Sequence, residues 1–323
     1  MADDIDTQLT KYLTDAHSIE EQALAQLRTA PDIAGDPEIS KIFEEHLTET
    51  EEQERLVRER LAAREGSPSR IKDAVMAAGG KGFVLFAKSQ PDTPGKLVTH
   101  AYSYEHLELG AYGLLRRVAE RAGDTDTTEV AQRIAGEEQA MADRLAANFD
   151  RAADAALEEA GQGDIEKQLV KYLADAHAIE SQAEQLLSRG PKIAGDPELE
   201  RLYEEHLEET KGHKQRIEQR LEAHGASPNS LQDAAMRLGA LNWGTFFQAQ
   251  PDTPGKLACF AFAFEHLEIG GYEQLRRVAE RAGDTETVDT VNAILSEERA
   301  AAQKIAGAFG RAAEASLSAV GVA

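Results

Sequence analysis

The feature that most constrains the fold is an internal repeat. Ile33–Glu38 (IAGDPE) returns as Ile193–Glu198, and Leu115–Asp124 (LRRVAERAGD) returns as Leu275–Asp284. The two halves of the chain therefore align at an offset of 160 positions, and no gap is needed. A period of this length indicates a duplicated domain rather than a solenoid of short repeats.

The length of the chain agrees with a division into two domains. At 323 residues it exceeds the usual size of one domain, and two domains of about 150 residues are the expectation. The join falls at Gly161–Gly163, and Asp164 follows as a candidate cap for the next helix. We therefore predict one domain over residues 1–160 and a second over residues 164–323.

Hydrophobic periodicity predicts an all-α fold. Apolar residues recur at helical spacing, as at Ile5, Leu9 and Tyr12, and almost no alternating strand pattern is visible. Capping residues followed by proline mark helix starts, as in Asp36–Glu38 (DPE). In the first copy, four long helices are expected near residues 4–29, 37–64, 94–122 and 125–159.

The lengths of the connections indicate how these helices are arranged. The first two helices and the last two are joined by short connections, which favour antiparallel neighbours. Between the second and third helices lie about thirty residues that hold a short helical piece of their own. The prediction is therefore all-α: tandem ferritin-like four-helix bundles, each with a long helical crossover between helices 2 and 3.

Charge and cysteine content exclude several classes of function. The net charge of −23 repels nucleic acids and anionic lipid headgroups, so neither is an expected partner. Cys259 is the single cysteine, which excludes an intramolecular disulfide and a cysteine-based metal site. No secretion signal is visible, and no apolar run approaches the roughly 18 residues that span a bilayer. We expect a cytoplasmic protein.

Acids and histidines interrupt the apolar stripe of each long helix near its middle. His17 and Glu20, for example, are three residues apart and share one face of the first helix. Several buried carboxylates would repel one another unless cations neutralised them, so we predict a metal site in each bundle. The candidate ligands are His17, Glu20, His46, Glu49, Glu105, Glu108 and Glu138 in the first copy, and His177, Glu180, His206, Glu209, Glu265, Glu268 and Glu298 in the second.

Carboxylate oxygens combined with imidazole nitrogens suit a dinuclear centre, with iron preferred and manganese or zinc as alternatives. Two assignments stay open. Glu138 is preferred over Glu137 because it continues the row of Ile134 on the fourth helix. His106 follows Glu105 by about 100° around the helix, so it either ligates the metal directly or acts behind the ligands or in an interface; the same holds for His266.

The motifs of the four helices resemble the YciE/YciF-type ferritin-like metal-binding family. They read Asp15-Ala16-His17-x-x-Glu20, Glu45-His46-Leu47-x-Glu49-Thr50, Glu105-His106-x-Glu108-x-x-Ala111-Tyr112 and Glu137-Glu138. The resemblance covers nearly the whole of each copy. It implies a ferritin-like bundle, often dimeric, with a di-metal centre and a link to stress responses, but it implies no defined reaction. The His-x-x-Glu order on the first two helices reverses that of rubrerythrin-like oxidases, so a different ligand geometry is expected.

Two functions follow from these features. The first is a stress-related di-iron or di-manganese protein that reacts with Fe(II), peroxide or dioxygen, as a ferroxidase-like oxidase or peroxidase. The second is a non-enzymatic structural or interaction protein, in which the polar cluster is a metal-free buried network. Metal ions are the expected small partners of the first function. For either function we expect an internal pseudo-dimer of the two copies, and further homo-oligomerisation is left open.

Overall fold

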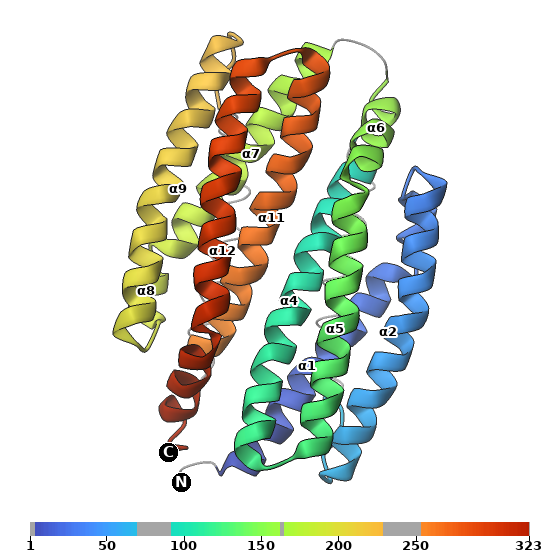
Figure 1. Cartoon of the computed structure of the whole chain (residues 1–323), viewed down its shortest axis with the longest axis vertical. Coiled ribbons are helices and arrows are strands. Elements are labelled where there is room, and N and C mark those ends of the chain that lie inside the picture. Colours follow the sequence, from blue (N-terminus) through green and yellow to red (C-terminus); the bar gives the residue numbers. More distant parts are fainter. Residues whose placement is uncertain (1–3, 70–91, 162–164, 229–252, 323) are drawn as a thin grey trace. The chain divides into compact units, whose positions relative to one another are not determined.

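The computed structural model describes residues 4–69, 92–161, 165–228 and 253–322, and within these ranges the chain is helical without a strand. It divides at Gly161 into two compact units (Figure 1). The helices of the first unit are α1 (Ile5–Leu27), the short 3-10 helix η1 (Pro31–Ile33), α2 (Pro37–Ala63), α4 (Thr93–Ala122), α5 (Thr125–Ala147) and α6 (Phe149–Glu159). Those of the second are α7 (Ile165–Leu187), α8 (Gly190–Ile193), α9 (Pro197–Ala223), α11 (Thr253–Ala282) and α12 (Thr285–Ala319). The all-α prediction and the tandem repeat are confirmed.

The long helices of each unit close on one another. In the first unit α1 packs against α2 and α4, and α5 packs against the same two helices. The second unit repeats this arrangement, with α7 and α12 each packed against α9 and α11. The long crossover expected between helices 2 and 3 falls in residues 70–91 and 229–252, which lie outside the described residues. No helix in the described ranges is long and apolar enough to cross a bilayer.

Apolar rows build the core of each bundle. In the first unit the buried set includes Leu9 and Leu13 of α1, Ile39 and Phe43 of α2, and Ile134 of α5. Each pair on one helix is spaced by four residues, which keeps its members on a single face. Most of the candidate ligands lie in these same rows, so forming the core also buries them, whereas Glu49 and Glu209 stay partly exposed.

The turn that leads into α2 depends on a glycine and an aspartate. Gly35 has a positive φ of 69°, and a Cβ built on it would lie 2.4 Å from Cγ of Pro94 at the start of α4. Asp36 then caps α2, because its side chain accepts hydrogen bonds from the backbone N–H groups of Glu38 and Ile39. This turn therefore needs a residue without a side chain both for its backbone conformation and for its packing.

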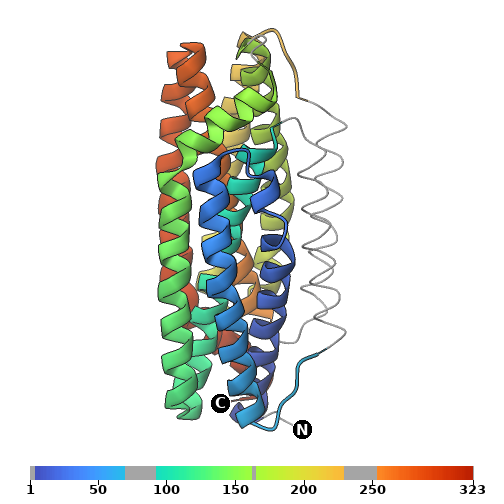
Figure 2. The ribbon, with the colours of Figure 1, turned by 90° about the vertical axis from the view of Figure 1, so that its right-hand side faces the viewer.

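The last helix of the bundle differs between the two copies. A single helix was expected over residues 125–159, but α5 ends at Ala147 and α6 begins at Phe149. Figure 2 shows the green ribbon of these two helices changing direction. The Asn148 side chain donates a hydrogen bond to the carbonyl of Arg144 at 2.8 Å, and its backbone leaves the helical region. Asparagine competes in this way for helix carbonyls. Ala308 occupies the equivalent position in α12, which continues without a break.

Replacing glycines at two contrasting positions tests this account of the turn. We expect Gly35→Ala to lower the free energy of unfolding by about 1–2 kcal/mol, because alanine is strained at positive φ and would press against Pro94. The control Gly136→Ala lies in α5, where a Cβ meets no atom within 4 Å, and should raise it by about 0.5–1 kcal/mol. Urea unfolding followed by circular dichroism measures both. Equal effects of the two substitutions would contradict the account.

Candidate metal centre

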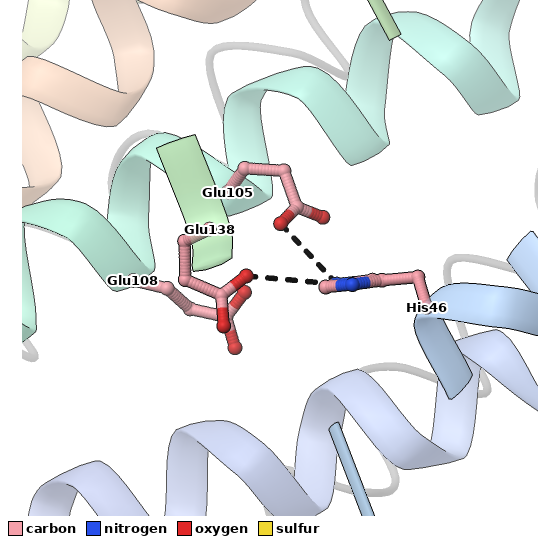
Figure 3. A group of neighbouring side chains, drawn as sticks. All are labelled: His46, Glu105, Glu108 and Glu138. Carbon is pink, nitrogen blue, oxygen red and sulfur yellow. Dashed lines mark ion pairs between the residues drawn. The ribbon is translucent and has the colours of Figure 1, made fainter. Parts of the chain in front are cut away.

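Four buried side chains from three helices meet in the middle of the first bundle. They are His46 of α2, Glu105 and Glu108 of α4, and Glu138 of α5, and one N or O atom from each lies within 4.8 Å of the others (Figure 3). His46 Nε2 lies 3.3 Å from Glu105 Oε2 and 3.5 Å from Glu138 Oε2. We call these four residues the His46 group.

Helical spacing explains why these side chains meet. Glu105 and Glu108 are three residues apart, so both project from one face of α4. Glu138 lies between the fully buried Ile134 and Met141 in the apolar row of α5. Because these apolar neighbours pack in the core, the carboxylate is buried with them and loses its hydration by water.

The carboxylates of the centre make few of the hydrogen bonds that buried oxygens need. Neither oxygen of Glu108 or Glu138 has a hydrogen-bond partner among the described residues, and the same holds for Oε2 of Glu105. Buried polar atoms are nearly always hydrogen-bonded, and a buried charge is costly unless it is paired. A cation bound between these oxygens and His46 Nε2 would satisfy them, and a mixed oxygen and nitrogen donor set suits iron, manganese or zinc. The residues present therefore fit a metal.

Glu20 of α1, the remaining long helix of the bundle, adds a carboxylate beside this group. It is fully buried, and the Tyr112 hydroxyl donates a hydrogen bond to its Oε1, while its Oε2 has no partner in the described part of the chain. Burial raises the pKa of Glu20 to about 8, although the bond from Tyr112 acts in the opposite direction. Glu20 lies beside the His46 group rather than within it.

The electrostatics of the centre favour proton uptake when no metal is bound. Burial, followed by the nearby carboxylates, raises the pKa of Glu108 and of Glu138 well above the usual value for glutamate. Burial lowers the pKa of His46, but the charge and hydrogen bonds of Glu105 and Glu49 outweigh it and raise the pKa to about 9. Protons and metal ions would thus compete for the same atoms.

Two further expected ligands, besides Glu20, lie outside the His46 group. Glu49 is partly exposed and accepts hydrogen bonds from His46 Nδ1 at 3.1 Å and from Arg144 Nη2 at 2.6 Å. It thereby holds the imidazole with Nε2 toward the centre. His17 instead contacts α2, where its Nε2 lies 3.0 Å from Glu54 Oε1. The structure does not bring Glu49 or His17 together with Glu105, Glu108 and Glu138.

The two open assignments have clear positions. Glu138 is in the group, whereas Glu137 accepts hydrogen bonds from Arg133 at 2.9 Å and Gln53 at 3.2 Å on the outer side of α5. His106 donates from Nδ1 to the carbonyl of Tyr102 at 2.7 Å and lies outside the group. Burial lowers the pKa of His106 to about 4, so the ring is neutral. His266 makes the same bond to the carbonyl of Phe262, also at 2.7 Å.

The second bundle contains an equivalent centre, which we call the His206 group: His206, Glu265, Glu268 and Glu298. His206 Nε2 lies 2.9 Å from Glu265 Oε1, and Glu209 accepts from the opposite nitrogen at 3.1 Å. Glu180 receives the hydroxyl of Tyr272, as Glu20 receives that of Tyr112. His177 again turns away, toward Glu218 at 3.0 Å.

His213 is not among the ligands expected from the sequence, and it has no histidine counterpart in the first copy. The structure buries it completely, with Nδ1 2.7 Å from Glu298 Oε1 and 3.4 Å from Glu180 Oε1. The available signal was its spacing of seven residues from His206, which is two helical turns on one face. The other two histidines without counterparts lie elsewhere. His224 Nε2 is 2.8 Å from Asp284 Oδ2, and His100 lines a small cavity beside His46.

The raised pKa values predict how pH affects the metal-free protein. Glu20, at a pKa of about 8, and Glu298, at about 7, keep protons in the folded state that unfolded glutamate releases near 4.5. Their contribution to stability is present at low pH and lost as pH rises through these values. We expect the free energy of unfolding of the chelated protein to fall between pH 5 and pH 9, by about 2 kcal/mol or more. Urea unfolding across this range measures it, and a constant or rising stability would contradict the burial of these carboxylates.

Comparison with known proteins identifies the family of the chain. The family model described as "Domain of unknown function (DUF892)" matches residues 4–158 and, a second time, residues 164–318. The two matches cover both helical units and both buried groups. No solved structure matches the chain. The chain therefore belongs to the DUF892 family, which is the YciF-type family, and carries two copies of its domain in tandem.

Proposed function

We propose that this chain is a ferritin-like metal-binding protein, and that each of its bundles binds transition-metal ions at its buried Glu and His residues. The observation that carries the proposal is the set of carboxylate oxygens without hydrogen-bond partners, gathered within 4.8 Å of an imidazole nitrogen in both bundles. Iron is the preferred metal for this donor set, with manganese or zinc as alternatives. The closed packing of four long helices supports the ferritin-like assignment.

In the first bundle, His46, Glu105, Glu108 and Glu138 would hold the metal, with Glu20 beside them. A bound redox-active metal would supply electron transfer to or from peroxide or dioxygen. Residues of the chain would prepare the centre: Glu49 orients His46, and Tyr112 fixes Glu20 through its hydroxyl. The apolar rows around the group keep bulk water away, which strengthens its electrostatic interactions. A stress-related oxidase, peroxidase or ferroxidase-like role is part of this proposal and rests on the family resemblance.

A metal-free structural role is the competing proposal. It is favoured by the position of His46, which lies between Glu49 on one nitrogen and Glu105 on the other. With protons shared among the carboxylates, this cluster could specify the bundle without a metal, in a protein that acts as a scaffold or interaction partner.

Metal analysis distinguishes the two proposals. Protein purified from metal-replete medium should hold at least one transition-metal ion per bundle, and Glu108→Gln combined with Glu268→Gln should remove most of it. Glutamine retains the shape and an oxygen but not the charge, so these variants should still fold. Glu51→Gln, which alters an exposed glutamate of α2, is the matched control and should leave the metal content unchanged.

Thermal unfolding provides an independent measurement. Metal that binds only the folded state should stabilise it by about 2.7 kcal/mol when the free ion is at one hundred times its Kd. Removing metal with a chelator should therefore lower Tm in the wild-type protein, and much less so in the double glutamine variant. A Tm that does not respond to chelator, in protein that contains no transition metal, would favour the metal-free network.

A further inference from the structure

The two bundles differ at one buried position that faces the centre. Gln53 in α2 corresponds to His213 in α9, and both side chains are completely buried. Each side chain contacts a partly exposed glutamate on the last long helix of its bundle, α5 or α12. Gln53 Nε2 donates to Glu137 Oε2 at 3.2 Å, and His213 Nε2 lies 2.8 Å from Glu297 Oε2. The remaining polar atom of each side chain, Gln53 Oε1 or His213 Nδ1, is buried without a well-oriented hydrogen bond from the described residues.

The orientation of His213 is that of a metal ligand. When Nε2–H donates to Glu297, the neutral ring presents the lone pair of Nδ1 to the interior. There Nδ1 lies 2.7 Å from Glu298 Oε1 and 3.4 Å from Glu180 Oε1. At these distances Nδ1 can pair with both carboxylates through a proton when no metal is bound, so a proton and a cation would compete for it. A donor atom directed between two carboxylates in this way matches a position for a cation.

Glu298 connects this position to the His206 group. Glu180, His213 and Glu298 form a second set of donor atoms within 4.8 Å of one another, and Glu298 also belongs to the His206 group. Its Oε1 faces His213 Nδ1 at 2.7 Å and its Oε2 faces His206 Nε2 at 3.8 Å, so one oxygen is available to each set. A carboxylate shared between two sets of ligands is the arrangement that bridges two metal ions.

The corresponding position of the first bundle has a weaker donor. Glu20, Gln53 and Glu138 occupy it, so a carboxamide oxygen replaces the imidazole nitrogen. Imidazole is the better ligand for Fe²⁺, Co²⁺ and Zn²⁺, whereas an amide oxygen suits harder cations such as Mg²⁺ and Mn²⁺. His17 with Glu21 and Glu54 does not compensate, because Arg58 lies 3.3 Å from Glu54 and already neutralises it.

We propose that the two centres are unequal: His213 completes a second tight metal position in the second bundle, whereas the Gln53 position of the first bundle binds the same ion at least about tenfold more weakly. This inference rests on the proposed metal-binding function. It assigns three tight sites to the chain, namely the His46 group, the His206 group and the set that shares Glu298.

Co²⁺ binding to the metal-stripped full chain tests the proposal. Isothermal titration and the visible absorption of bound Co²⁺ should both give three tight ions per chain, one for each of the three ligand sets. Two reciprocal exchanges then convert each centre into the other. His213→Gln should remove one tight ion, and Gln53→His should add one. His224→Gln is the matched control, because it removes a histidine that lies on Asp284 and should not alter the count.

The possible outcomes separate this inference from the proposed function. A tight-site count that neither exchange changes would overturn the inequality but leave metal binding in place. Absence of tight Co²⁺ binding in the wild-type chain and in every variant would overturn both. If circular dichroism shows that His213→Gln does not fold, Gln53→His decides alone. A gain of one tight ion supports the proposal, and an unchanged count refutes it.

Discussion

The structure depends on keeping several carboxylates in a core that water does not reach. An isolated ionised carboxylate costs several kcal/mol to bury, so a cluster of them is unfavourable unless protons, hydrogen bonds or cations compensate. Each bundle offers a part of that compensation from its own residues: the Tyr112 hydroxyl on Glu20, and the His46 ring beside Glu105. The oxygens of Glu108 and Glu138 remain for a cation or a proton. Packing of the apolar rows of the four helices supplies the favourable free energy that keeps these carboxylates together in the core.

Duplication allowed the two centres to change separately. In the first bundle Glu54 pairs with His17 and with Arg58, whereas the second has Lys214 and Glu218 at the equivalent positions. The charges have exchanged places along the helix, and His177 pairs with Glu218 instead. This histidine keeps a carboxylate partner on the neighbouring helix although neither charge has stayed in position. The exchange of Gln53 for His213 is different in kind, because it alters the atoms directed at the centre itself.

Periodicity predicted the long helices well, and it failed where one residue acts through its own side chain. Asn148 interrupts the last helix of the first bundle by bonding a backbone carbonyl, which an apolar pattern does not reveal. The ligand set shows a similar limit. Helical spacing puts His17 and Glu20 on nearby faces, yet one meets Glu54 at the side of the bundle and the other meets the centre. The rotation of each helix about its own axis in the bundle decides between these outcomes, and the spacing of residues along one helix does not specify that rotation.

The sequence by itself determined the duplication, the helical class and most of the buried acids and histidines, because each of these follows from local pattern. Only the tertiary structure decided which of those side chains share a site. It grouped His46 with Glu105, Glu108 and Glu138, placed Glu49 behind His46, and brought His213 against Glu298. Those outcomes depend on contacts between helices that are far apart in the chain, and such contacts are set by how whole helices pack rather than by the residues next to each ligand.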